Sequence, residues 1–391
     1  MSTQPTWLTA TYLEKILQNF FHDPELKVRE FHVSSGSNLG DGYASQIFRI
    51  NTKTSTKIFS IIAKVLLKST AIQAAEEKLN FYEKEKLMLG MMLPKLITKL
   101  PSSEKFFPKF YHADDANRAL FIEDLCEDGY RLCEHTSGVD LPHSLLVMEA
   151  LAKFHASSYL IFKEKPELTK DFEKCFYSKE QTSYIEKTII NNTRKGLLEI
   201  IDKVNLPEEY KIKLKNGSDW TSKLIDTWVR KDENINVLIQ TDCWANNLMF
   251  KYNNNDVEAV KLIDFQLATY NSFAFDLIAF IFSSTNVFVR VNHLDTLLDY
   301  YYVIFTGITG DVPNFTKEIF KKEFNERIFF AFLTTIAFTP WAMAPPKKQA
   351  VDLDALVKDE ESPESIEIFK NPKYLECLEM TLPYFVKNGV V

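Results

Sequence analysis

Glycine and proline are scarce in this chain, which has 11 glycines and 15 prolines among 391 residues. Long flexible linkers are rich in these residues, so a string of small, loosely connected domains is not expected. The sequence has no internal repeat and no low-complexity segment. Its length exceeds that of most single compact domains and fits two lobes that share one cleft.

Cysteine is also rare and shows no pattern. A chain of this length does not need disulfides to stabilise it, and no pair of cysteines has the spacing of metal ligands. The N-terminal segment lacks a basic stretch followed by an apolar run, so no secretory signal is visible. We therefore expect a cytoplasmic protein with reduced cysteines. The five are Cys126, Cys133, Cys175, Cys243 and Cys377.

An excess of positive charge is missing as well. The formal net charge is −7, whereas a general nucleic-acid-binding protein needs a basic face to displace counterions. A nucleic-acid partner is therefore not expected. The most apolar run, residues 328–343, is short for a membrane span and contains Pro340. We expect a buried helix there and no membrane span.

Residues 1–124 have the pattern of a small mixed lobe. The run 70–92 is rich in Ala, Glu, Lys and Leu and predicts a helix that Pro94 ends. β-Branched and aromatic runs predict strands ahead of this helix and after it. The expected strands cover residues 48–50, 59–67 and 119–123, and a polar turn covers residues 51–57.

Residues 125–391 are typical of a larger, mainly helical lobe. Apolar residues at three-and-four spacing predict an amphipathic helix at 145–160. Short strands are expected at 237–240 and 260–263, and the polar turn 253–256 between them indicates a hairpin. The chain after Asp276 is expected to be helical to near its end. The predicted fold class is therefore α+β, with an antiparallel sheet in the small lobe.

The segment VLIQTDCWANNLMFKYNNNDVEAVKLIDF carries the strongest chemical signal. Asp242 follows the first strand, Asn247 lies five positions later, and Asp264 ends the second strand. Mg²⁺ prefers oxygen ligands, usually one or two protein side chains together with phosphates and water. The pattern fits phosphoryl transfer, with Asn247 and Asp264 holding the metal and Asp242 accepting the proton of an attacking hydroxyl. Asp and Asn also cap turns, so a purely local role is the alternative.

Phosphoryl transfer further requires groups that hold the phosphates. Gly40 and Gly42, followed by Ser45, precede the first strand, where a phosphate-covering loop would lie, although they also fit an ordinary turn. Lys64 interrupts the apolar run FSIIAKVLL, which favours a lysine directed at the phosphates. An edge-strand lysine that reaches solvent is the alternative.

An acidic partner for this lysine is expected from the following helix, which offers several glutamates. The candidates are Glu76, Glu77, Glu83 and Glu85. Glu123 and Leu125 follow the strand ALFI, where backbone groups of an interlobe connector would meet an adenine edge.

Three further residues stand out in the larger lobe. We expect His155 to brace the core helix against the catalytic loop, and Asp276 to cap or anchor loop backbone. Trp244 fits either an acceptor pocket or the core.

The segments GDGYASQIFRI, FIEDL, LAKFHASS, TDCWANNLMF and VKLIDFQLATYNSFAFDL, in this order, resemble the ecdysteroid kinase-like family. This family is typical of insects and is related to choline kinases and aminoglycoside phosphotransferases. The resemblance extends from about residue 36 to about residue 338. It implies a protein-kinase-like fold of two lobes. It also implies phosphorylation of a hydroxyl group on a small molecule, with ATP and Mg²⁺ as cofactors and an ecdysteroid or a detoxified compound as acceptor.

The resemblance also implies individual roles. Asp242 matches the catalytic base, Asn247 and Asp264 match the metal ligands, and Lys64 matches the phosphate-contacting lysine. The family's glutamate lies about nine positions before a proline, and counting back from Pro94 selects Glu85. The nucleotide-binding set is then Gly40, Gly42, Ser45, Lys64, Glu85, Glu123, Leu125 and Asp264.

One departure from the family stands at the catalytic loop. The family normally has His-Gly-Asp, whereas this chain has Gln240, Thr241 and Asp242. Glutamine can donate and accept hydrogen bonds, so it can replace part of the histidine's bracing role. Threonine is unfavourable if this position needs a positive φ.

Three functions therefore stay open. They are a kinase for a lipophilic alcohol, a choline- or ethanolamine-type kinase, and a pseudokinase that binds nucleotide or steroid without turnover. A protein kinase is not expected, because no Ala-Pro-Glu motif follows Asp264. No obligate protein partner is expected either.

Overall fold

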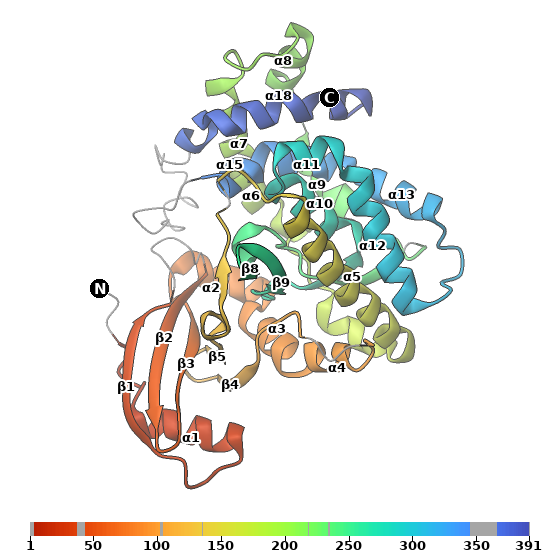
Figure 1. Cartoon of the computed structure of the whole chain (residues 1–391). Coiled ribbons are helices and arrows are strands. Elements are labelled where there is room, and N and C mark those ends of the chain that lie inside the picture. Colours follow the sequence, from red (N-terminus) through yellow and green to blue (C-terminus); the bar gives the residue numbers. More distant parts are fainter. Residues whose placement is uncertain are drawn as a thin grey trace.

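Alternating apolar residues build a five-stranded antiparallel sheet in the first third of the chain (Figure 1). The structure is a computed structural model that describes residues 4–36, 44–101, 105–134, 136–217, 219–233, 235–344 and 366–390. The strand order is β1-β2-β3-β5-β4. The strands are β1 (Val28–Ser35), β2 (Ser45–Thr54), β3 (Ile58–Leu66), β4 (Phe110–Asp114) and β5 (Ala119–Glu123).

One face of this sheet packs against helix α1 (Ala10–Phe21). Leu13 and Leu17 of α1 are buried in one cluster with Phe48 of β2 and Phe121 of β5. The strands predicted at 48–50, 59–67 and 119–123 are confirmed within β2, β3 and β5. The outer strands β1 and β4 were not predicted, because their side chains are mostly half-buried and show no clean alternation.

The helix predicted at 70–92 is interrupted and also continues further than predicted. Asn80 adopts a left-handed conformation (φ 54°) between α2 (Thr70–Leu79) and α3 (Phe81–Leu87). The expectation that Pro94 ends the helix is wrong, since a π-helical turn (Met88–Met92) leads into α4 (Leu93–Ile97). Pro94 has no N–H to donate, but it lies in the first turn of α4, directly after the wider π-helical turn. Both features accommodate a proline, so the helix continues past it.

The larger part of the molecule is built around helix α5 (Leu141–Glu164). This helix packs along α12 (Leu294–Thr309) and against the strands that carry the site. By length and composition α5 is the one helix among the described residues that could cross a membrane, but 67% of its apolar 18-residue stretch is buried in the protein. It therefore has the surroundings of a core helix. The helix predicted at 145–160 is confirmed, but its predicted amphipathic character is not, because buried side chains occupy more than one of its faces.

The remaining helices lie on the side of the molecule away from the five-stranded sheet (Figure 1). Residues 328–343 are helical and largely buried, as predicted. The shorter helices are α6 (Thr182–Ile185), α7 (Asn191–Ile200), α8 (Glu208–Lys215), α9 (Trp220–Trp228), α10 (Ala274–Ser284), α11 (Val287–Asn292), α13 (Lys317–Asn325), α14 (Ile328–Leu333), α15 (Thr339–Ala342) and α18 (Pro372–Lys387).

Two small sheets lie within the helical part. Strand β7 (Asn236–Ile239) pairs with β10 (Thr269–Ser272), and β8 (Leu248–Asn253) pairs with β9 (Asp256–Leu262) and β6 (Tyr130–Leu132). The predicted turn at 253–256 is correct, but the strand before it is β8 and not the one predicted at 237–240. The buried Leu248 and Phe250 alternate with less buried residues, which is the signal that marks β8.

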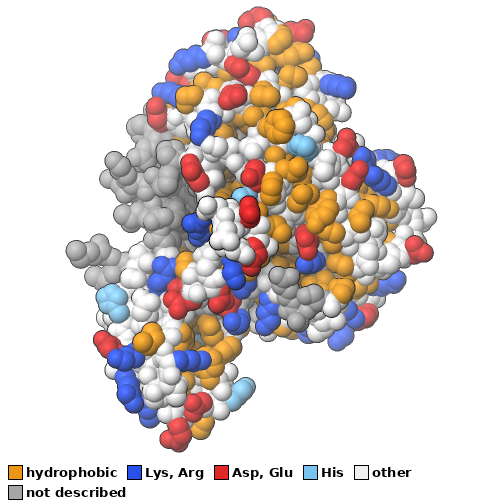
Figure 2. All heavy atoms as spheres, in the orientation of Figure 1, with side chains coloured by type: hydrophobic (Ala, Val, Ile, Leu, Met, Phe, Trp, Pro, Cys, Tyr) orange, Lys and Arg blue, Asp and Glu red, His pale blue; other side chains and the backbone are white. Residues whose placement is uncertain are grey.

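Charged side chains of both signs are interspersed over the face of the molecule seen in Figure 2. The overall excess of acidic residues, with a formal net charge of −7, is thus accompanied by local mixing of charge on this face. All five cysteines are free thiols.

Candidate active site

Lys64 forms a buried ion-pair group with two carboxylates. Its Nζ lies 2.7 Å from Oε2 of Glu85 and 2.9 Å from Oδ1 of Asp264. Lys64 is 8% exposed and Glu85 is 4% exposed. Strand β3 lies between β2 and β5, so the alternative of an edge-strand lysine is wrong. Of the candidate glutamates, Glu85 is the one that contacts Lys64.

Burial and charge act against each other in this group. Burial disfavours the charged ammonium, but the carboxylates of Asp264 and Glu85 outweigh it, so the pKa of Lys64 is raised. Burial raises the pKa of Glu85, although Lys64 opposes this effect. Glu85 Oε1 also accepts the backbone N–H of Phe265 at 3.3 Å, which holds the residue after Asp264 in place. Helix α3 is thereby joined to the segment that carries Asp264.

Asp242 and Asn247 lie together after strand β7. Asn247 Nδ2 donates to Oδ2 of Asp242 and to its backbone carbonyl, both at 2.9 Å. Asn247 also lies beside the Asp264 segment, because its carbonyl accepts the N–H of Ile263 at 3.0 Å. The three oxygen-bearing residues predicted from the sequence are therefore neighbours.

The Asp242 carboxyl group has an unusual proton affinity. Burial raises its pKa to about 7, and the negative charge of Asp264 acts in the same direction. The hydrogen bond from Asn247 opposes this shift. A carboxyl group with a pKa near neutrality is a better proton acceptor than an ordinary aspartate once it is ionised.

The loop before Asp242 is held from behind by Asp276. The Asp276 carboxylate accepts the backbone N–H groups of Gln240 at 2.6 Å and of Thr241 at 2.8 Å. His155 Nε2 lies 3.2 Å from Oδ2 of Asp276, and His155 Nδ1 lies 2.9 Å from the Tyr301 hydroxyl. Both sequence expectations hold, since Asp276 anchors loop backbone and His155 braces it from helix α5.

The two residues that depart from the family occupy distinct environments. Gln240 Nε2 donates to the carbonyl of Ile263 at 2.5 Å and to that of Asp264 at 3.3 Å, so it bridges the catalytic loop to the Asp264 segment. Thr241 has φ 74°, the left-handed conformation that favours glycine. The position therefore has the positive φ that makes threonine unfavourable there.

A cleft of about 440 Å³ brings most of the predicted nucleotide-binding residues together. Glu123 reaches it, but its carboxylate is paired with Lys109 at 2.5 Å and Lys261 at 3.1 Å. Gly40 and Gly42 lie outside the described residues. The predicted residues that line the cleft are Ser45, Lys64, Glu85, Glu123, Leu125, Asn247 and Asp264. Lining residues that sequence reasoning missed include Arg49, Cys126, Arg131, Met249 and Gln266.

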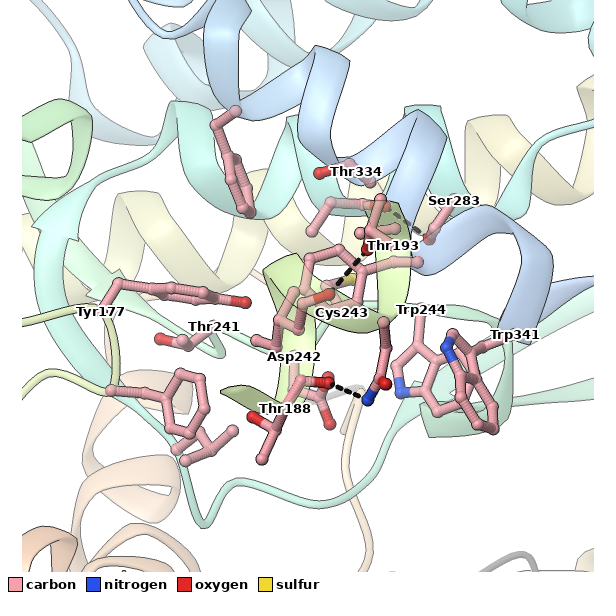
Figure 3. Close-up of a pocket in the computed structure, with 18 of the residues that line it drawn as sticks. Tyr177, Thr188, Thr193, Thr241, Asp242, Cys243, Trp244, Ser283, Thr334 and Trp341 are labelled. Atoms are coloured by element: carbon pink, nitrogen blue, oxygen red, sulfur yellow. Dashed lines mark hydrogen bonds between the residues drawn. The ribbon is translucent and has the colours of Figure 1, made fainter. Parts of the chain in front are cut away.

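A second cavity, of about 310 Å³, has Asp242 in its wall (Figure 3). Its wall is mostly aromatic and aliphatic, and Asp242 is the one carboxylate among the described lining residues. Trp244 lines this cavity, which favours the pocket alternative for this residue. Sequence reasoning missed the other aromatic members, because they come from distant segments. They are Phe176, Tyr177, Tyr184, Phe330, Phe338, Trp341 and Phe369.

The sheet lobe, the helical lobe and the group of Lys64, Glu85 and Asp264 define the class of two-lobed, kinase-like proteins. The chain belongs to the ecdysteroid kinase-like family, whose model matches residues 39–309. No curated protein matches the sequence. Family and fold together support a small-molecule kinase.

Solved structures of small-molecule kinases are similar in fold. A choline kinase from Cryptosporidium parvum has a TM-score of 0.51 at 12% identity, with 98% of each chain covered. An ethanolamine kinase from Plasmodium vivax has a TM-score of 0.48 at 14% identity, covering 97% of this chain and 90% of the other. A spectinomycin phosphotransferase in complex with ADP and spectinomycin has a TM-score of 0.44 at 12% identity, covering 94% and 98%.

Proposed function

We propose that this protein transfers the γ-phosphate of ATP, with Mg²⁺, to a hydroxyl group of a lipophilic small molecule. An ecdysteroid, or a related steroid or xenobiotic alcohol, is the leading acceptor. One observation carries this proposal. The cleft that contains Lys64 and Asp264 and the apolar cavity that contains Asp242 are adjacent, and the hydrogen bond between Asn247 and Asp242 joins them.

The residues of the cleft fit a magnesium nucleotide. Asn247 uses its Nδ2 for Asp242, which leaves its amide oxygen as a metal ligand. The Asp264 side chain is 25% exposed and supplies the carboxylate ligand. When bound, Mg²⁺ neutralises charge on the phosphates. Lys64, oriented by Glu85, would pair with phosphate oxygens.

Asp242 has the position of a base and orienting group. The acceptor oxygen attacks the γ-phosphorus, the bond from this phosphorus to the β–γ bridging oxygen breaks, and ADP leaves. The hydroxyl proton passes to the Asp242 carboxylate. Positioning contributes more than basicity, because even a carboxyl group with a pKa of about 7 is far less basic than an alkoxide.

The chemistry of the second cavity favours an uncharged, apolar acceptor. A choline- or ethanolamine-type acceptor is the alternative, and aromatic side chains such as Tyr177, Trp244 and Trp341 could contact an ammonium group. However, the single carboxylate of the described lining is Asp242, which is needed at the reacting hydroxyl. A cationic head group would compete with the reacting hydroxyl for it.

The contacts of Gln240 support a catalytic protein over a pseudokinase. Gln240 links the catalytic loop to the carbonyls of Ile263 and Asp264, and Asp276 holds the loop backbone. Lys64, Asp242, Asn247 and Asp264 are all present at the site. We therefore propose that replacing His-Gly with Gln-Thr leaves turnover possible.

The remaining proposals concern organisation and location. We place the boundary between the lobes at residues 124 and 125, where the five-stranded sheet has ended. We propose that the protein acts in the cytoplasm, which its free cysteines support. We further propose that it needs no obligate protein partner.

The test is turnover of ATP and Mg²⁺ with a panel of ecdysone, plant alcohols, choline and ethanolamine, with phosphorylated product read by mass. Product on ecdysone or another apolar alcohol would support the proposal. Product on choline or ethanolamine alone would replace it with the alternative. Tight ATP binding without any product would favour the pseudokinase.

A further inference from the structure

Tyr177 is held rigidly in the wall of the second cavity. It lies between two short 3₁₀ segments, Pro166–Phe172 and Lys179–Gln181, and is 8% exposed. Its ring stacks on Trp228 with centroids 4.3 Å apart, and Trp228 stacks in turn on Phe275 at 3.7 Å. Phe330 contacts the same ring edge-on at 5.8 Å. The direction of the hydroxyl is therefore set by packing.

The Tyr177 hydroxyl is directed into the cavity. Figure 3 shows its oxygen on the side of the pocket where Thr241, Asp242 and Cys243 lie. Across the part of the chain that the structure describes, this hydroxyl has no hydrogen-bond partner. A buried tyrosine hydroxyl usually has one, so its partner is expected to be a molecule that occupies the cavity.

Three other hydroxyl groups in the same wall are already satisfied. Thr188 Oγ1 donates to the carbonyl of Tyr184 at 2.7 Å, and Thr193 Oγ1 to that of Ile189 at 2.8 Å. Ser283 Oγ donates to the carbonyl of Ala279 at 2.6 Å. Their donors are used within their own helical segments. The hydroxyl oxygens of Thr241 and Thr334, in the same wall, also have no partner within the described residues, but both atoms are buried in the protein. Tyr177 differs from the three satisfied hydroxyl groups in presenting an open donor on the side of Asp242.

We propose that the Tyr177 hydroxyl positions the acceptor by hydrogen-bonding a second oxygen atom of that molecule, and so turns the reacting hydroxyl toward Asp242. This inference rests on the proposed function, because it takes the second cavity as the acceptor site. It narrows the acceptor class to lipophilic molecules that carry at least two oxygen atoms. A monohydric alcohol would satisfy Asp242 and leave the tyrosine without a partner.

The electrostatics of the site define which oxygen Tyr177 recognises. Burial and the charge of Asp242 both raise the pKa of Tyr177, so the phenol stays neutral at any physiological pH. A neutral hydroxyl can donate to a keto oxygen and can donate to or accept from a hydroxyl. The nearby Asp242 charge disfavours a carboxylate on the acceptor.

The test replaces the hydroxyl and keeps the ring. Tyr177→Phe preserves the stacking on Trp228 and removes only the donor. Tyr302→Phe is the matched control. Tyr302 lies on helix α12, which does not line the cavity, and its hydroxyl donates to the carbonyl of Phe315 at 3.2 Å. Each full-length protein is assayed with MgATP and with ecdysone, which has several oxygen atoms, or 1-decanol, which has one. Binding is followed in parallel by tryptophan fluorescence, since Trp244 and Trp341 line the cavity.

Loss of one hydrogen bond is expected to raise the KM and Kd for ecdysone about tenfold in Tyr177→Phe. The KM for ATP, and the binding of 1-decanol, should stay at wild-type values. A packing role would predict equal losses with both alcohols, and Tyr302→Phe should change neither. Equal KM and Kd for ecdysone in wild type and Tyr177→Phe would overturn the inference and leave the proposed function standing. A wild-type protein that neither binds nor phosphorylates either alcohol would overturn both.

Discussion

Replacing Thr241 with glycine is expected to raise the free energy of unfolding, although the substitution removes a buried side chain. Thr241 is 5% exposed, has φ 74°, and its hydroxyl has no hydrogen-bond partner within the described residues. A β-branched residue is unfavourable in this conformation, whereas glycine adopts it freely. The protein therefore holds a strained residue next to its proposed base.

The magnitude follows from opposing effects. The left-handed conformation is unfavourable by about 1–2 kcal/mol for a residue with a Cβ atom, and glycine removes this strain. Glycine also loses about 0.5–1 kcal/mol more backbone entropy on folding, and the buried methyl group of the threonine contributes about 0.8 kcal/mol. Removal of an unpaired buried hydroxyl returns about 1–3 kcal/mol. At the middle of these ranges the net expectation is a gain of about 2 kcal/mol.

Thr52→Gly is the matched control. Thr52 is 1% exposed, and its hydroxyl also has no partner among the described residues, but it lies in strand β2 with ordinary extended backbone. The hydroxyl and methyl contributions are thus similar at the two positions. They differ in the strain that is relieved at Thr241 and in the strand propensity that is lost at Thr52. The two variants should differ by about 2–3 kcal/mol, with Thr52→Gly the less stable.

The assay is chemical denaturation of both variants and of the wild type, in one buffer without ligands. Thr241→Gly should have a transition midpoint at or above that of wild type, and Thr52→Gly a midpoint below it. If both glycine variants lose the same stability, strain at Thr241 does not contribute and the reasoning fails.

The other predictions concern the proposed catalytic residues. Asp242→Asn should abolish phosphoryl transfer and leave ATP binding nearly intact, and wild-type turnover in this variant would refute the assignment of the base. The same variant has a pH signature. The folded protein binds the Asp242 proton more tightly than the unfolded chain does between pH 3.8 and about 7, so this group lowers stability as pH rises through that window. Because the cavity admits water, we expect Asp242→Asn to exceed wild-type stability by only about 1–2 kcal/mol at pH 8, and by nothing at pH 3, in thermal denaturation. Asp264→Ala should remove the Mg²⁺ dependence of nucleotide binding in calorimetric titrations, and unchanged affinity would count against its role as a ligand. Gln240→Ala should lower the free energy of unfolding by about 1–2 kcal/mol and should also lower turnover, because it removes the hydrogen bonds to the carbonyls of Ile263 and Asp264. Gln240→His should retain turnover. An alanine variant with wild-type activity would show that the bridge to Asp264 is dispensable.

Residues close together in the sequence were sufficient to indicate the centre of the candidate site. Asp242 and Asn247 lie on one loop and Asp264 follows the next hairpin, so their chemistry depends on short-range spacing that a single segment carries. Lys64 was recognisable because a lysine inside an apolar strand is unusual. Selecting Glu85 among four glutamates required the spacing typical of the family, since charge alone did not separate them. The contact of 2.7 Å with Lys64 agrees with that choice.

Local patterns were weaker wherever the backbone departs from regular geometry. The left-handed Asn80 and the π-helical turn before Pro94 both lie inside a run that otherwise has strong helix propensity. Strand β8 was missed because it is short and polar at its end, although its turn was recognised. In these places tertiary contacts decided the conformation, and propensity over a few residues did not.

By itself, the sequence determined the fold class, the strand that carries Lys64, the strand that precedes Asp264, and the loop that carries Asp242. These depend on hydrophobic periodicity and spacing that act over short stretches of chain. The tertiary structure alone decided the shape and chemistry of the second cavity and the stack that fixes Tyr177. Such features arise where segments far apart in the sequence pack together, as Tyr177 and Phe330 do. No local pattern records which distant side chains will share a wall, because that depends on the packing of the whole core.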